Sequence, residues 1–155
     1  PTWLRRQRQM CIRDRNKSIK DKDVKRLVIC SGKVFYDLFE AREKNKLFNI
    51  KILRLEQIYP FPIKSLQEFI SKTPQAEIIW CQEEPENMGS WSFIDRRLEK
   101  VLIDCNCKYK RPVYVGRPEA ASPATGTMSR HLKEQKLLVN QALGLEKINT
   151  ASAAE

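Results

Sequence analysis

Short apolar runs alternate with segments of helical period over most of this chain. Each of four runs has the length and apolar content of a buried strand, and a segment with apolar side chains at helical spacing follows it. The four runs are residues 27–30, 50–55, 77–82 and 112–116. Strands that alternate with helices form βαβ units, whose sheet is mostly parallel and covered on both faces. We therefore expect an α/β fold of three layers, with helices on both faces of the sheet.

The two ends of the chain differ in composition from its middle. Residues 1–25 are a basic arm without apolar period, which we predict to be disordered or non-native, because residues 7–15 resemble translated sequencing-adapter DNA. Residues 26–146 are the predicted domain, and residues 147–155 a flexible tail. Of the net charge of +10, residues 1–26 carry +7. A basic surface for nucleic acid or a membrane would therefore depend on the arm.

The cysteines favour a reducing compartment. Their number is five, and Cys30 and Cys81 lie in apolar strand-like runs, which is typical of structural thiols. Cys105 and Cys107 are too close together for the usual metal-binding pair, and the chain has one histidine, so no metal site is predicted. No run approaches the ~20 apolar residues of a membrane span, and no secretory signal is visible.

Polar side chains gather after the third predicted strand, in residues 81–91 (CQEEPENMGSW). Glu83, Glu84 and Asn87 could carry acid–base chemistry, or they could pair with an arginine and cap the next helix. The second interpretation is favoured because no nucleophile elbow, phosphate loop or dinucleotide motif is present. We expect at least one of the two glutamates to face Arg117 or a helix N-terminus, since adjacent like charges need compensation.

The loop after the fourth strand is the best candidate for binding an anion such as a nucleotide phosphate. The alternative is a structural cover in which Arg117 pairs with Glu83 or Glu84. His131, just inside the next helix, is expected to be a hydrogen-bonded structural residue. The candidate anion or effector site comprises Arg117, Ser122, Thr125 and Arg130.

The segment Tyr59-Pro60-Phe61-Pro62 follows the second strand and is rigid, because each proline restricts the backbone around it. It would hold Tyr59 and Phe61 in fixed directions, which suits packing against another domain or subunit. Packing within this domain is the alternative.

Three segments together resemble the C-terminal domain of the decarboxylating component of 2-oxoglutarate dehydrogenase, a transketolase-like family. Residues 28–36 (VICSGKVFY) also fit the opening of that domain, and the likeness covers residues 24–145 in the family's order. The three segments are residues 54–62 (RLEQIYPFP), 81–91 and 114–126 (YVGRPEAASPATG). The resemblance implies the fold of a transketolase C-terminal domain.

The resemblance also implies a parent enzyme that uses thiamine diphosphate and magnesium to decarboxylate 2-oxoglutarate and passes the succinyl group to lipoyl groups. In this family the cofactor motifs belong to earlier domains, so the chain is expected to bind neither cofactor and to be inactive alone. Its expected role is structural, at interfaces with the remaining domains of the parent subunit, a homodimer partner and the dihydrolipoyl acyltransferase component.

Two further expectations follow from the same resemblance. Some relatives bind adenine-nucleotide or acetyl-CoA effectors near this region, which favours the candidate effector site. The expected location is the bacterial cytoplasm or the mitochondrial matrix, with no nucleic acid or membrane partner. The alternative function is a stand-alone basic α/β module that binds RNA through residues 1–26.

Overall fold

The computed structural model describes residues 19–148, which fold around one four-stranded sheet. All three strand pairings are parallel, and the strand order is β2-β1-β3-β4. The strands are β1 (Arg26–Cys30), β2 (Ile50–Arg54), β3 (Glu77–Pro85) and β4 (Val113–Arg117). The helices are the 3-10 turn η1 (Asp21–Asp23), α2 (Val34–Lys44), α3 (Ile63–Ile70), α4 (Trp91–Asp104) and α5 (Met128–Ala142). The predicted α/β class is confirmed.

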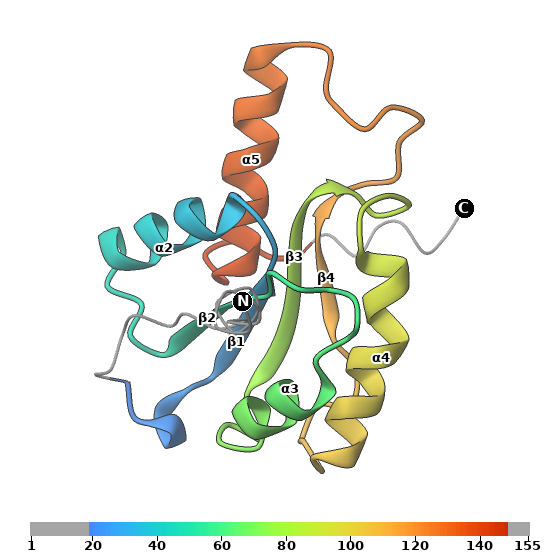
Figure 1. Cartoon of the computed structure of the whole chain (residues 1–155). Helices are drawn as coiled ribbons and strands as arrows, with labels where there is room; N and C mark the ends of the chain where they lie inside the picture. The colour runs from blue at the N-terminus through green and yellow to red at the C-terminus, as the bar shows by residue number, and fades with distance from the viewer. Residues whose placement is uncertain (1–18, 149–155) are drawn as a thin grey trace, which may run out of the picture.

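The sheet separates two apolar cores. Helices α2 and α5 cover one face and α3 and α4 cover the other (Figure 1). Successive side chains of a strand point to opposite faces, so Leu27 and Ile29 enter the core under α3 and α4. Val28 and Cys30 enter the core under α2 and α5. Because β1 is buried on both faces, its sequence is a continuous apolar run and does not alternate.

The carboxyl ends of the four parallel strands share one edge of the sheet. Strand β2 pairs with one side of β1 and β3 with the other, so the chain changes direction across the sheet at β1. In open α/β sheets, ligands usually bind at this edge near such a point. The N-terminal half of α5 projects beyond this edge, together with the loop that connects it to β4 (Figure 1).

The packed part of the chain begins before residue 26, where the sequence places the domain boundary. Val24 is 1% exposed and belongs to the core under α3 and α4. Asp21 forms an ion pair with Lys51 of β2, and the Gln75 amide donates to the carbonyls of Asp21 (2.9 Å) and Val24 (3.2 Å). The rest of the predicted arm, residues 1–18, and residues 149–155 of the predicted tail lie outside the described residues. That residues 1–15 are non-native stays a prediction.

Strand β3 is longer than predicted. Its pairing with β4 shifts register after Cys81 and resumes at Pro85, which lies opposite Arg117. Glu83 and Glu84 therefore belong to the end of a strand, not to the loop where the sequence pattern puts them. A register shift depends on the neighbouring strand, so the local pattern of β3 does not reveal it.

Candidate functional site

Gln82 organises the turn between β3 and α4. Its side chain is 2% exposed, and its Oε1 accepts hydrogen bonds from the indole N–H of Trp80 (2.9 Å) and the backbone N–H of Trp91 (3.1 Å). Its Nε2 donates to the carbonyls of Met88 (2.8 Å) and Pro85 (3.1 Å). One buried amide thus fixes the whole turn and caps the first residue of α4. The sequence interpretation missed this role, because no local pattern shows that Gln82 points inward.

Tyr114 and Gly116 of β4 pack closely against the end of β3. The Tyr114 hydroxyl lies 2.9 Å from the Arg117 carbonyl and 3.0 Å from the Glu84 carbonyl, and it donates to one of them at a time. Burial raises the pKa of Tyr114 well above its usual value, so the hydroxyl stays a donor. A Cβ at position 116 would collide with this hydroxyl and lie 2.9 Å from the Gln82 carbonyl oxygen, so the position requires glycine.

The predicted polar cluster of Glu83, Glu84 and Asn87 does not form one group. Glu83 points toward α5, where its Oε1 accepts a hydrogen bond from Gln135 (2.8 Å) and lies 4.0 Å from the Lys33 ammonium. Glu84 is exposed. Asn87 binds the backbone of Ala120 at two points, accepting from its N–H (3.2 Å) and donating to its carbonyl (3.0 Å). Glu83 and Asn87 therefore hold separate parts of the structure, and the side chain of Glu84 is exposed.

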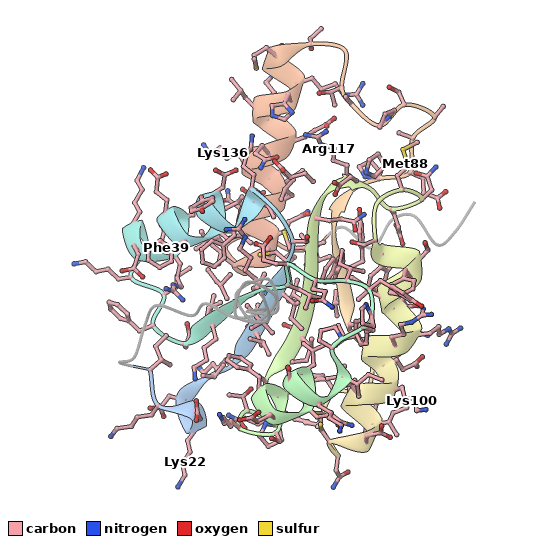
Figure 2. The ribbon with its side chains drawn as sticks, in the orientation of Figure 1. Lys22, Phe39, Met88, Lys100, Arg117 and Lys136 are labelled. Atoms are coloured by element: carbon pink, nitrogen blue, oxygen red, sulfur yellow. The ribbon has the colours of Figure 1, made fainter. Side chains whose placement is uncertain are left out.

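Arg117 pairs with Glu134 of α5, and not with Glu83 or Glu84 as the alternative interpretation of the sequence had it. Its Nε lies 3.2 Å from Glu134 Oε2, and its Nη2 donates to His131 Nδ1 (2.8 Å). His131 Nδ1 must be unprotonated to accept this bond, which places the proton of a neutral ring on Nε2. Arg117 lies beside α5, near the ends of β3 and β4 (Figure 2). The helix therefore supplies the counter-charge that we expected from β3.

The structure brings the four residues of the candidate anion site to one cavity of about 460 Å³. Arg117 comes from the end of β4, Arg130 from the first turn of α5, and Ser122 and Thr125 from the loop between them. Glu134 also lines this cavity and forms a second ion pair with Arg130 (2.7 Å). One carboxylate is thus paired with both arginines. Sequence analysis missed Glu134, since a glutamate four residues after Arg130 is typical of an ordinary helix surface.

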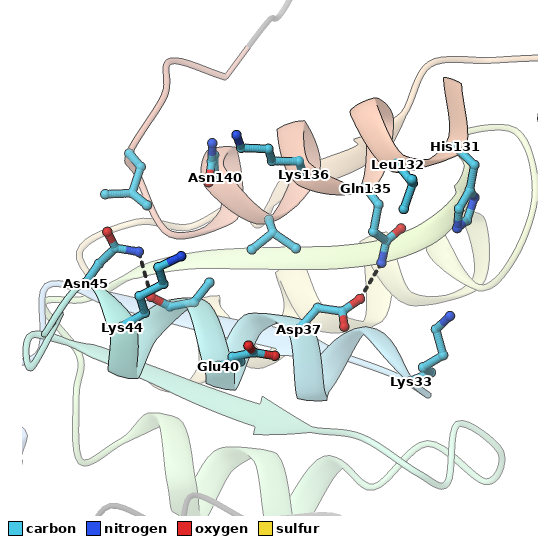
Figure 3. Close-up of a pocket in the computed structure, with 13 residues that line it drawn as sticks. Lys33, Asp37, Glu40, Lys44, Asn45, His131, Leu132, Gln135, Lys136 and Asn140 are labelled. Carbon is cyan, nitrogen blue, oxygen red and sulfur yellow. Dashed lines mark hydrogen bonds between the residues drawn. The ribbon is translucent and has the colours of Figure 1, made fainter. Parts of the chain in front are cut away.

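A second cavity of about 800 Å³ lies between α2 and α5 (Figure 3). Gln135 crosses it and donates to Asp37 of α2 (2.7 Å) and to Glu83 of β3 (2.8 Å). Both carboxylates are thus held by one amide. Lys33 and Lys136 lie at the rim (Figure 3). Gln135 therefore acts as a bridge between two helices and a strand.

The predicted interface residues differ in their surroundings. Tyr59 is 81% exposed, and its ring lies 6.3 Å from that of Phe93 in an edge-on arrangement. Phe61 is partly buried and packs against the core under α3 and α4. The alternative of internal packing therefore applies to Phe61, whereas Tyr59 faces solvent.

The buried thiols are poor nucleophiles. Cys30 and Cys81 lie opposite one another in the pairing of β1 with β3, and both are fully buried. Burial raises the pKa of Cys30 to about 12, and burial also raises that of Cys81. Among residues 19–148, no three side chains of His, Cys, Asp or Glu gather as a metal site would require. No helix in the same range has the length and apolar character needed to cross a membrane.

Known proteins resemble this chain over most of its length. Residues 5–143 match the family "2-oxoglutarate dehydrogenase C-terminal". Curated proteins named "2-oxoglutarate dehydrogenase E1 component" from Brucella anthropi, Brucella ovis and Brucella melitensis are each 54% identical to the chain over 125 residues. The match covers 81% of this chain and 12% of each relative.

Proposed function

This chain belongs to the 2-oxoglutarate dehydrogenase C-terminal family, and we propose that it supplies the C-terminal domain of a subunit that decarboxylates 2-oxoglutarate. The observation that carries the proposal is the 54% identity over 125 residues to relatives named as the E1 component of that enzyme. The chain spans only 12% of the length of these relatives. The catalytic steps are therefore assigned to the rest of such a subunit.

In this proposal thiamine diphosphate and magnesium are held by other domains and supply the decarboxylation chemistry. Residues 19–148 do not fit a magnesium site. No three metal-binding side chains gather in this range, and Gln135 already engages the carboxylates of Asp37 and Glu83. We therefore assign this chain no step of the reaction.

The proposed role is to complete the subunit and its contacts. Tyr59 is large, aromatic and 81% exposed, which suits an anchor at an interface with the remaining domains or a homodimer partner. We propose that the parent subunit passes succinyl groups to the lipoyl groups of an acyltransferase component. A cytoplasmic location in a bacterium agrees with the bacterial source of the relatives.

The cavity at the end of β4 is the proposed effector site. Arg117, Ser122, Thr125 and Arg130 line it together, and two guanidinium groups are suited to phosphate or carboxylate oxygens. RNA binding, the alternative function, has no support from the family to which the chain belongs.

A chimeric enzyme tests the proposal. The matching 125 residues of the Brucella anthropi relative are replaced by those of this chain, and succinylation of a lipoyl domain is measured with 2-oxoglutarate as the substrate. We expect activity within about tenfold of the unmodified enzyme, and none in a control that lacks the region. A chimera that folds and binds thiamine diphosphate but stays inactive would refute the proposal.

A further inference from the structure

We propose that the Glu134 carboxylate is a built-in counter-ion that occupies the anion site and is displaced when an oxyanionic ligand binds. The inference rests on the proposed function in one respect: the ligand occupies the cavity of the proposed effector site. It adds a residue that sets the affinity of the site, and it predicts that the affinity rises when this carboxylate is removed.

The first argument is the charge of the cavity. The charged side chains that line it are Arg117, Glu119, Arg130 and Glu134, whose formal charges cancel. Arg117 is the buried member, with a side chain that is 8% exposed, and a buried charge without a partner would be costly. Glu134, at 20% exposure, provides that partner. An external anion must therefore compete with Glu134 for the same guanidinium group.

The second argument is that the internal pair is imperfect. Among residues 19–148, six buried side-chain polar atoms lack a hydrogen-bond partner, and three of them belong to residues that line this cavity. The three atoms are Arg117 Nε, Glu134 Oε2 and Thr125 Oγ1. Arg117 and Glu134 are 3.2 Å apart but poorly aligned, so their attraction lacks the hydrogen bond that usually accompanies it. Buried polar groups left in this state favour a ligand that satisfies them.

The third argument concerns how Glu134 is held. Arg130 is 70% exposed and lies one helical turn from Glu134, so this ion pair sits at the surface and is weak. Glu134 is itself 20% exposed and is also paired with the buried Arg117, so it can turn toward solvent when a ligand takes its place at Arg117. A ligand with two or more charged oxygens could then contact Arg117 and Arg130, and its third partner would be the Thr125 hydroxyl. Phosphate and carboxylate ligands share this chemistry.

The test measures binding to the full chain by calorimetry, with inorganic pyrophosphate and succinate as separate probes. We expect Glu134→Gln to bind at least one probe about tenfold more tightly than the wild type. The probe whose affinity rises in the Glu134→Gln variant shows whether the site prefers phosphate or carboxylate. The matched control is Glu68→Gln, which removes the same charge from an exposed position on α3 and should leave the affinity unchanged.

Equal affinities of the Glu134→Gln and Glu68→Gln variants, or no binding of either probe by any variant, would overturn the inference. Arg130→Gln provides a second measurement. Because Arg130 is mostly exposed, its replacement should leave the domain folded. It should weaken binding about tenfold in the Glu134→Gln background, and an unchanged affinity would also count against the inference. Binding needs no turnover, so an inactive chimera would refute the proposed function without changing this result.

Discussion

The side-chain oxygen of Gln82, near the end of β3, accepts a hydrogen bond from the first backbone N–H of α4, that of Trp91, at 3.1 Å. The same amide donates to the Met88 carbonyl at 2.8 Å. The side chain of a strand residue therefore determines where the next helix begins. Neither partner is adjacent to Gln82 in sequence, although all three lie within ten residues.

Replacement of Gln82 by Glu should destabilise the domain by about 3 kcal/mol, because the carboxylate keeps the acceptor but loses the donors for Met88 and Pro85. Urea denaturation of both proteins measures the difference in the free energy of unfolding. Gln67→Glu on α3, at a partly buried position, is the matched control and should change it by less than about 1 kcal/mol. Equal effects of the two variants would contradict the role given to Gln82.

Asn87→Ala should release the loop between β4 and α5 with little loss of global stability, about 0.5–1 kcal/mol. The side chain is exposed and makes both of its bonds to the backbone of Ala120. Hydrogen exchange of the Ala120 amide should become faster, since its acceptor is lost. Asn87→Asp retains the acceptor and should preserve most of the protection. An unchanged exchange rate in the alanine variant would argue against the clamp.

Gly116→Ala should cost about 2–3 kcal/mol, because the added Cβ meets the Tyr114 hydroxyl and the Gln82 carbonyl. The matched control is Gly126→Ala, whose Cβ would have no atom within 4 Å and whose effect should stay within about 0.5 kcal/mol. Thermal unfolding of the two variants measures how much stability each substitution removes. If both lose the same stability, close packing at Gly116 is not the cause.

Alkaline pH should destabilise the wild type more than a Cys30→Val variant. Burial raises the folded-state pKa of Cys30 from its ordinary value of 9.0 to about 12. Between these values the unfolded chain has lost the thiol proton and the folded chain has kept it, so stability falls as pH rises through this window. Because valine cannot titrate, the wild type should lose about 2 kcal/mol more than the variant between pH 8 and pH 10.5. Parallel pH profiles in urea denaturation would exclude this contribution.

Tyr59→Ser should leave the free energy of unfolding of this chain within about 0.5 kcal/mol of the wild type, because the ring is largely exposed. In the chimeric enzyme the same change should lower the melting temperature or promote subunit dissociation, which light scattering detects. Phe61→Ser is the contrasting variant and should cost about 2 kcal/mol in this chain alone, since Phe61 packs against the core. If Tyr59→Ser changes neither the melting temperature nor the subunit association of the chimera, Tyr59 does not belong to the proposed interface.

The arrangement of strands and helices could be predicted because its signals are local. The apolar run of β1 is continuous, which requires cover on both faces, and helical spacing follows each strand. The length of β3 could not be predicted in this way. Its end depends on the register shift opposite β4, which brings Pro85 beside Arg117. A strand's hydrogen-bonding partner is distant in sequence, so its own pattern does not show where pairing stops.

The sequence by itself determined the α/β class, the family and the set of residues that could form an anion site. Only the tertiary structure decided which charges meet. Arg117 had two nearby candidates in Glu83 and Glu84, yet the packing of α5 against the sheet brings Glu134 to its guanidinium group and Gln135 to Glu83. The physical reason is that ion pairs depend on how a helix is rotated and placed on the sheet, and that rotation is set by burial of its apolar face in the core.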